Sequence, residues 1–387
     1  MDDTFLPEGA DGGLLPAGLA DALPPQASRE EALVSQLLAG FAAQGYELIK
    51  PPLVEFEETL LSGTGVAMRP HCFRLMDPVS QRMMGVRPDI TPQVARIART
   101  RLQHAPRPLR LCYAGEVLRV RGSQLRPARQ FEQVGAELIG ATSATADAEV
   151  VALAAAALEA IGVGHLSVDL TVPTLVPALA DAMGLEPARI QRLREALDRK
   201  DAAAVEAAMA GMPGDAAQPF AALLRAAGPA DKAMAALGRI ALPPAALAER
   251  ERLAEVIGLI RAALPELTLT VDPVEMRGFE YERGVSFTFF ARGVHGELGR
   301  GGRYAASGAE PATGFTLYMD SVGRALPPPQ APRRVYLPAG TAHDVARRLR
   351  GEGWITVAAL EPAPDASAEA RRMGCLHRWS GTAIVTA

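Results

Sequence analysis

The sequence has 387 residues, with 40 lysines and arginines against 44 aspartates and glutamates, and a formal net charge of −4. Because domains commonly span roughly 100 to 200 residues, this length predicts a large core with one or two smaller domains. The slightly acidic balance excludes the global positive field that attracts a polyanion, so any contact with nucleic acid would have to be local.

The cysteines and the apolar segments indicate the compartment. Cys72, Cys112 and Cys375 are scattered without CxxC spacing, which favours free thiols in a reducing cytoplasm over metal ligands. The start, MDDTFLPEGADGG, has no basic region and no apolar run behind it, so we expect no secretory signal. The longest apolar stretch, VVALAAAALEAIGVG, contains Glu159 and is shorter than the roughly 20 residues that span a bilayer. We therefore expect a cytoplasmic protein without a membrane partner.

After an N-terminal extension over residues 1–27, the sequence predicts an amphipathic helix. Ser28 and Glu31 have the spacing of a capping box, in which each side chain satisfies a free backbone amide of the first turn. Apolar residues follow at helical spacing, and Gly45 supplies a stop. The next segment, YELIKPPLVEF, has strand composition, but Pro51 and Pro52 cannot donate to a central ladder. It is therefore expected to be an edge or interface strand.

The segment MMGVRPDITPQVARIARTRL predicts a strand that runs into a helix. Pro92 suits the first turn of that helix, because its missing amide hydrogen would be unsatisfied there in any case. Asp89 and Thr91 are therefore expected at the corner between the strand and the helix.

A hairpin is predicted over residues 110–140, with several arginines in its loop. Its second strand, ARQFEQVGAELIG, alternates with period two, which puts Phe131, Gln133, Gly135 and Glu137 on one face. A glutamine and a glutamate flanking a glycine predict a small polar floor with room for a ligand above Gly135.

The remaining segments complete an α+β fold. A helix over about 147–162 and a strand, HLSVDLTV, precede an alanine-rich helical insertion over residues 174–262, and strands resume after it. Antiparallel strands with inserted helices, and no regular βαβ alternation, indicate an α+β core made of residues 28–173 and 263–326. The proline-rich linker 327–333 leads to a short α/β domain over residues 334–387.

The glycine-dense stretch GELGRGGRY lies in this second half of the core. No lysine followed by serine or threonine comes after the glycines, as a phosphate cradle would need. We favour a tight turn or a bulge for these glycines.

Polar residues inside segments that otherwise have core composition need an explanation, because an unpaired buried charge is costly. Asp89 could receive the ammonium group of an amino acid, and Arg277 could bind its carboxylate bidentately. An internal ion-pair network would explain the same residues equally well. Spacing alone leaves both interpretations open.

The segment LCYAGEVLR…RQFEQVGAELIG resembles motif 2 of class II aminoacyl-tRNA synthetases, in particular histidyl-tRNA synthetase. The resemblance extends in order to VRPDITPQVAR, RGFEY and GGRY, across about residues 28–326. It implies a class II synthetase-like antiparallel sheet flanked by helices. It also implies the following histidine-site residues: Asp89, Thr91, Gln133, Glu137, Arg277, Tyr281 and, next to the retained tyrosine, Glu282. Arg119 matches the motif 2 arginine that holds the α-phosphate of ATP.

The departures from the synthetase pattern concern ATP and the imidazole side of the pocket. Arg121 replaces the motif 2 glutamate, and Ser321 stands where motif 3 has an arginine. Because serine cannot supply a fixed positive fork, we expect adenylation to be lost or badly weakened. Glu282 replaces the second tyrosine of the histidine motif; it could favour a protonated imidazole or point into solvent. The tail is also shorter than the anticodon-binding domain that the resemblance implies.

One branch of the family combines these features, the regulatory subunits of ATP phosphoribosyltransferase. The resemblance implies a non-catalytic subunit, without a cofactor, that activates a short-form catalytic subunit in the first step of histidine biosynthesis and mediates feedback by histidine. It also implies a homodimer within a hetero-octamer, and no tRNA partner. Class II cores pair through the region that corresponds to residues 28–56, although its prolines could equally be an ordinary guard on an edge strand.

Two other functions remain open. One is a class II ligase that activates an amino acid for a target other than tRNA, which Arg119 and Arg277 favour and Arg121 and Ser321 oppose. Exchange between ATP and pyrophosphate would reveal it. The other is a histidine sensor that acts on a different partner, which purification with bound proteins would identify.

Overall fold

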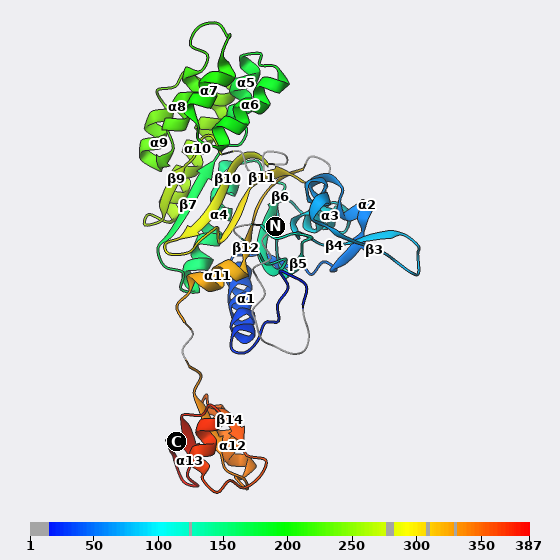
Figure 1. Cartoon of the computed structure of the whole chain (residues 1–387), viewed down its shortest axis with the longest axis vertical. Coiled ribbons are helices and arrows are strands. Elements are labelled where there is room, and N and C mark those ends of the chain that lie inside the picture. The colour runs from blue at the N-terminus through cyan, green and yellow to red at the C-terminus, as the bar shows by residue number, and fades with distance from the viewer. Residues whose placement is uncertain (1–14, 124–125, 276–281, 307–309, 329–330) are drawn as a thin grey trace. The chain divides into compact units, whose positions relative to one another are not determined.

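The computed structural model describes residues 15–123, 126–275, 282–306, 310–328 and 331–387, and for Thr64 and Glu282 only the backbone. The chain divides into two compact units, Met1–Pro327 and Pro328–Ala387. The division lies within a run of prolines. Each unit is described by itself, and Figure 1 gives the labels of the helices and strands.

The first unit is built on a sheet of nine described strands, ordered β1-β5-β6-β12-β11-β10-β7-β9-β8. The sheet is antiparallel except that β1 pairs with β5, and β7 with β9, in parallel. This mixed, mainly antiparallel sheet confirms the predicted α+β class. The strands are β1 (Glu47–Leu48), β5 (Leu109–Leu118), β6 (Gln130–Ile139), β7 (Leu166–Thr171), β8 (Gly228–Pro229), β9 (Thr268–Val271), β10 (Glu282–Ala291), β11 (Gly299–Ala305) and β12 (Pro311–Tyr318).

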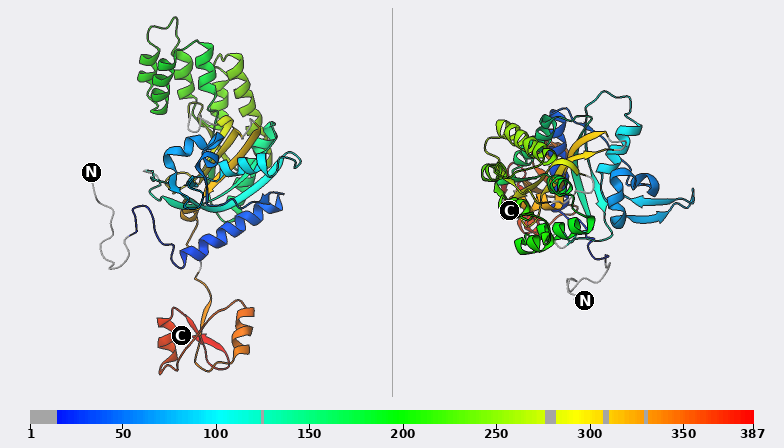
Figure 2. Two further views of the ribbon diagram at one scale, coloured as in Figure 1. Left: turned by 90° about the vertical axis from the view of Figure 1, so that its right-hand side faces the viewer. Right: turned by 90° about the horizontal axis from the view of Figure 1, so that it is seen from above.

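The two faces of this sheet carry two hydrophobic cores. The larger core includes the helices α1 (Gln26–Ala43) and α4 (Ala144–Ala160), and α1, the dark-blue helix of Figure 2, contacts β5 and β6. The smaller core includes Ile90, Val94 and Tyr113, beside α3 (Thr91–Thr100). Because side chains alternate along a strand, β6 presents Gln133 and Glu137 on the side of the smaller core.

The helix α1 begins three residues earlier than its sequence pattern indicates, because the predicted N-cap is Ser28 and the observed one is Pro25. Its N-cap is Pro25, without a side-chain cap, and Ser28 lies inside the first turn. The capping-box prediction for Ser28 and Glu31 is therefore wrong. The predicted stop is correct, because Gly45 has a φ of +85°, a conformation that glycine adopts without steric cost.

The prolines at 51 and 52 divide the predicted single strand between two sheets. The edge strand β1 ends at Leu48, and β2 (Val54–Phe56) belongs to a three-stranded sheet with β4 (Met83–Val86) and β3 (Phe73–Met76). Arg87 stabilises the segment between β1 and β2, because its Nη1 donates to the Pro51 carbonyl oxygen at 2.9 Å. The helices α2 (Glu57–Leu60) and η1 (Gly63–His71) connect β2 to β3.

The glycines Gly299, Gly301 and Gly302 lie in the strand β11, so the prediction of a tight turn or a bulge is wrong for them. Gly296, the first glycine of the segment, precedes the strand with a φ of +88°, as a turn requires. The register of β11 against β12 is continuous from Gly299 to Ala305. A Cβ atom on Gly301 would lie 2.1 Å from the Gly314 carbonyl oxygen, and one on Gly299 would lie 2.4 Å from that of Thr316. The glycines therefore permit close packing of neighbouring strands.

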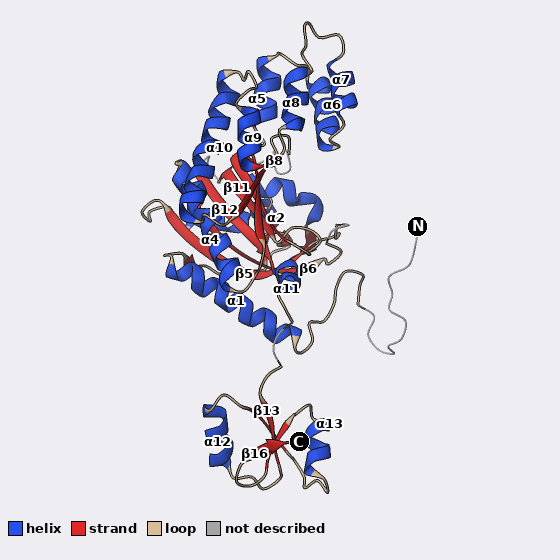
Figure 3. Ribbon diagram, turned by 90° about the vertical axis from the view of Figure 1, so that its left-hand side faces the viewer, coloured by secondary structure: helices blue, strands red, loops and turns tan. Residues whose placement is uncertain are grey.

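Between β7 and β9 the chain forms the predicted helical insertion, whose helices α5 to α9 gather at one end of the sheet (Figure 3). The helices are α5 (Leu175–Ala182), α6 (Pro187–Asp198), α7 (Ala202–Met209), α8 (Gln218–Arg225), α9 (Ala230–Leu237) and α10 (Pro244–Ala263). At its root, Arg252 of α10 and Arg303 of β11 each contact the fully buried Asp147 at 2.7 Å. None of the described helices is both long enough and apolar enough for a membrane span.

The second unit is a small α/β sheet ordered β14-β13-β15-β16. Its strands are β13 (Arg334–Leu337), β14 (Ile355–Ala358), β15 (His377–Trp379) and β16 (Ile384–Thr386), and its helices are α12 (His343–Gly351) and α13 (Ala366–Arg372). The sequence pattern misses α13 and β15, because elements of seven and three residues are too short to establish a period. In the first unit, α11 (Met319–Ala325) follows β12.

Candidate functional site

A pocket opens on the face of the sheet that carries the smaller core. Its lining comes from η1, the β4–α3 corner and the strands β6, β11 and β12, so segments far apart in the sequence build it together. The lining residues are Met68, Asp89, Thr91, Pro92, Glu137, Arg300, Gly301, Gly302, Tyr304, Gly314, Phe315, Thr316 and Tyr318.

The corner between β4 and α3 places Asp89 and Thr91 at this pocket. The Thr91 amide donates to Asp89 Oδ1 at 3.0 Å, and Gln133 Nε2 donates to Asp89 Oδ2 at 3.0 Å. The Ile90 amide in turn donates to Gln133 Oε1 at 3.1 Å. Gln133 is fully buried and uses both ends of its amide here, so it orients Asp89 from behind.

Glu137 forms the floor of the pocket and is only 1% exposed. Thr91 Oγ1 donates to its Oε1 at 2.8 Å, and the Tyr304 hydroxyl donates to its Oε2 at 2.9 Å. Burial raises the pKa of Glu137 from 4.5 to about 8, although the hydrogen bonds from Thr91 and Tyr304 lower it. Burial therefore makes loss of the proton from Glu137 less favourable than for an exposed glutamate.

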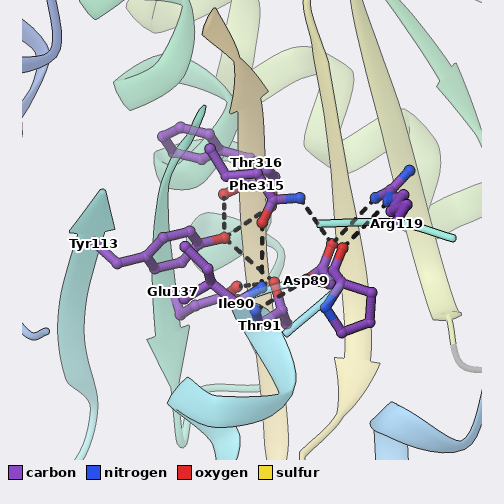
Figure 4. Close-up of polar contacts among 10 residues, drawn as sticks. Asp89, Ile90, Thr91, Tyr113, Arg119, Glu137, Phe315 and Thr316 are labelled. Atoms are coloured by element: carbon purple, nitrogen blue, oxygen red, sulfur yellow. Dashed lines mark hydrogen bonds and ion pairs between the residues drawn. The ribbon is translucent and has the colours of Figure 1, made fainter. Parts of the chain in front are cut away.

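Hydroxyl groups extend the network away from Glu137 (Figure 4). The Tyr113 hydroxyl lies 2.7 Å from Thr316 Oγ1 and 3.3 Å from Thr91 Oγ1. The space expected above Gly135 is filled, since a Cβ atom there would lie 2.4 Å from the Tyr113 hydroxyl. Gly314 instead leaves room for the Glu137 carboxyl group, since a Cβ atom on Gly314 would lie 1.7 Å from Glu137 Oε2.

The remaining predicted histidine-site residues lie on a segment that is only partly described. Arg277 and Tyr281 are outside the described residues. Glu282 begins β10, where its backbone pairs with Tyr304. Arg300, which sequence reasoning missed, adds a cation to the lining.

The three residues predicted as remnants of a nucleotide site lie in different surroundings. Arg119 is beside the pocket, with Nη2 3.8 Å from Asp89 Oδ2 and Nε donating to the Pro88 carbonyl oxygen at 3.2 Å. Ser321 is buried at the start of α11, where Arg324 Nη2 donates to its Oγ at 3.0 Å. Arg121 is exposed in the loop after β5.

The fold is that of histidyl-tRNA synthetase-like proteins. Residues 18–322 match the family model described as Histidyl-tRNA synthetase. A crystal structure described as an ATP phosphoribosyltransferase regulatory subunit/histidyl-tRNA synthetase from Bacillus halodurans C is similar, with a TM-score of 0.80 and 26% identity over 92% of this chain and 96% of that chain. These similarities confirm the predicted class II synthetase-like fold.

A relative from Rhodospirillum centenum named ATP phosphoribosyltransferase regulatory subunit is 58% identical, over 99% of this chain and 98% of the relative. The chain therefore belongs to the family of ATP phosphoribosyltransferase regulatory subunits. A chain in the ATP phosphoribosyl transferase (HisG:HisZ) complex from Thermotoga maritima shares the fold, with a TM-score of 0.61 and 18% identity over 75% of this chain and 97% of that chain.

Proposed function

We propose that this chain is a non-catalytic subunit that binds histidine in the pocket between Asp89 and Glu137. Through that pocket it controls a short-form catalytic subunit in the first step of histidine biosynthesis. Family membership supports the association with ATP phosphoribosyltransferase. The observation that carries the choice of ligand is the position of Glu137, a buried carboxyl group whose pKa burial raises to about 8, at the floor of a pocket whose rim bears Asp89.

The floor of the pocket suits an imidazole ring. Neutral imidazole has one nitrogen that donates a hydrogen bond and one that accepts, and the pKa of a histidine side chain in a model peptide is about 6.5. A protonated Glu137 can donate to the accepting nitrogen, and after proton transfer the carboxylate pairs with the imidazolium. In both arrangements Glu137 and the imidazole share one proton, and the pair has no net charge. A pair without net charge suits a buried site, because an uncompensated buried charge is costly.

The rim suits the other end of an amino acid. Each Asp89 carboxylate oxygen already accepts one hydrogen bond, and because each oxygen has two acceptor positions, both can also accept from an ammonium group. Arg300 and the undescribed Arg277 are candidates for the carboxylate. Opposite charges at the two ends would select a zwitterion and fix its direction in the pocket.

Several features argue against an active ligase. Adenylation needs preorganised positive charge on the triphosphate as charge develops in the transition state. Ser321 offers a hydroxyl at the position of the synthetase's arginine, and Arg121 replaces an acidic residue. We expect no exchange of pyrophosphate into ATP with any amino acid, and exchange stimulated by histidine would contradict this part of the proposal.

Calorimetric titration with histidine tests the pocket. Glu137→Gln cannot form the carboxylate that pairs with an imidazolium, and Thr91→Val removes a hydrogen bond to Glu137. Each should weaken binding by about 10- to 100-fold, because a hydrogen bond to a charged group contributes about 1.5–3 kcal/mol. Glu132→Gln is a matched control, since Glu132 lies on the same strand as Glu137 but outside the lining described above. Unchanged binding in Glu137→Gln would contradict the proposed site.

Feedback in the reconstituted complex tests the regulatory role. Histidine binding should bias a two-state assembly with a coupling of about 1–3 kcal/mol, typical of allostery. If Glu137→Ala and Arg277→Ala, both folded, left feedback by histidine unchanged, the pocket would not be the sensor. We also propose a homodimer through residues 28–56 within a hetero-octamer, without tRNA, in the cytoplasm. Light scattering of the reconstituted complex would test that stoichiometry.

A further inference from the structure

An aromatic pair lies directly beside the pocket. Tyr318, which lines the pocket at the end of β12, meets Phe131 of β6 edge to face, with ring centroids 5.9 Å apart. Both residues are buried, at 2% and 5% exposure. Arg119, which also approaches Asp89, has its guanidinium carbon 5.1 Å from the centre of the Phe131 ring. The pair and Arg119 therefore form a platform with a cation at its edge.

Arg126 occupies this platform. Its guanidinium carbon lies 3.6 Å from the centre of the Tyr318 ring and 5.1 Å from that of Phe131. Its Nε donates to Asp320 Oδ2 at 3.3 Å, and its Nη2 donates to Ser321 Oγ at 3.4 Å. An arginine on a surface loop normally keeps its charge in water, yet this side chain is only 10% exposed.

Backbone hydrogen bonds with Ser123 fix the backbone of Arg126. The Ser123 amide donates to the Arg126 carbonyl oxygen at 2.7 Å, and the Arg126 amide donates to that of Ser123 at 3.2 Å. This reciprocal pair of hydrogen bonds joins the backbones of Ser123 and Arg126, and the residues after Arg126 lead into β6. Arg126 is thus held by its backbone hydrogen bonds with Ser123 at one end and by the carboxylate of Asp320 at the other.

We propose that Arg126 is a built-in plug, which occupies a site for a planar, anionic ring compound such as a nucleotide and excludes that ligand. A guanidinium is a flat group that stacks on an aromatic face as a nucleobase does. With the plug removed, the rings would be free to stack a base, and Arg119 would attract its phosphate. The inference does not depend on which amino acid the neighbouring pocket binds.

A merely structural role for Arg126, fastening the loop to α11, predicts a different result. Under that role, removing the arginine would lower stability and, by removing a positive charge, would weaken any binding of ATP. Under the plug hypothesis the same change would strengthen the binding of ATP. The sign of the change in affinity therefore separates the two roles.

The experiment is a titration of the full chain with ATP, monitored by calorimetry, for wild type and Arg126→Ala. Stacking of one base corresponds to roughly 5- to 150-fold in affinity, so we expect Arg126→Ala to bind ATP about tenfold or more tightly than wild type. The control is Arg324→Ala, which removes a neighbouring arginine that contacts Asp320 and Ser321. It should show no gain. Adding Arg119→Ala to Arg126→Ala should abolish the gain.

If a folded Arg126→Ala protein bound ATP no more tightly than wild type, the proposal would be overturned. A circular dichroism spectrum and a melting temperature establish folding. If Arg126→Ala fails to fold, Asp320→Asn leaves the arginine in place but removes the charge that holds it. Asp320→Asn should then show a smaller gain in ATP affinity, and no gain would overturn the proposal.

Discussion

The protonation of Glu137 predicts how the stability of the first unit depends on pH. The pKa of this group is about 8 in the folded chain and 4.5 without burial. Between these values the folded chain holds a proton that unfolding releases, so the free energy of unfolding falls as the pH rises. At about 1.4 kcal/mol for each pKa unit, the effect reaches about 5 kcal/mol once the pH exceeds 8.

The substitution Glu137→Gln should remove this dependence, because an amide is a neutral group of nearly the same shape. In histidine-free protein, wild type and Glu137→Gln should have similar stability at pH 5. Wild type should then become progressively less stable than the variant toward pH 9. The Glu132→Gln control should behave differently, because burial raises the pKa of Glu132 only to about 7. Its difference from wild type should stop growing near pH 7, whereas the difference for Glu137→Gln should keep growing to about pH 8.

The assay is urea unfolding at several pH values, followed by far-ultraviolet circular dichroism. Tryptophan fluorescence would mislead here, because both tryptophans, Trp354 and Trp379, lie in the second unit. A difference between wild type and Glu137→Gln that does not change from pH 5 to pH 9 would refute the reasoning. Glu137 would then not be held protonated by its burial.

Two further predictions concern packing and charge in the first unit. Gly314→Ala should weaken histidine binding more than tenfold and cost about 2–4 kcal/mol of stability, because its Cβ atom would clash with Glu137 Oε2. Gly258→Ala, at an open helical position, should stabilise by about 0.5–1 kcal/mol; urea unfolding that ranks the two alike would contradict this. Asp147→Asn should cost about 3–5 kcal/mol in urea unfolding, since it leaves two arginines without their buried carboxylate. A loss below 1 kcal/mol would contradict that role.

Local patterns in the sequence predict the parts of the site that lie within one element. Period-two alternation correctly places Gln133 and Glu137 on one face of β6, and Pro92 correctly marks the corner that carries Asp89 and Thr91. These predictions succeed because side-chain direction along a strand, and the first turn of a helix, depend on neighbouring residues alone.

Partners that come from distant strands could not be predicted in this way. Tyr304 meets Glu137 across 167 residues, and Tyr113 meets Thr316 across 203 residues. Those contacts depend on the strand order β5-β6-β12-β11, which no local pattern encodes. The glycines of β11 misled for the same reason, because their purpose is the approach of a neighbouring strand.

The most direct test of the central claim is phosphoribosyl transfer to ATP by a short-form catalytic subunit, measured with and without this chain across a histidine titration. We expect the chain to stimulate the reaction and histidine to reverse the stimulation. Unchanged activity, together with no co-elution of the two chains, would contradict it.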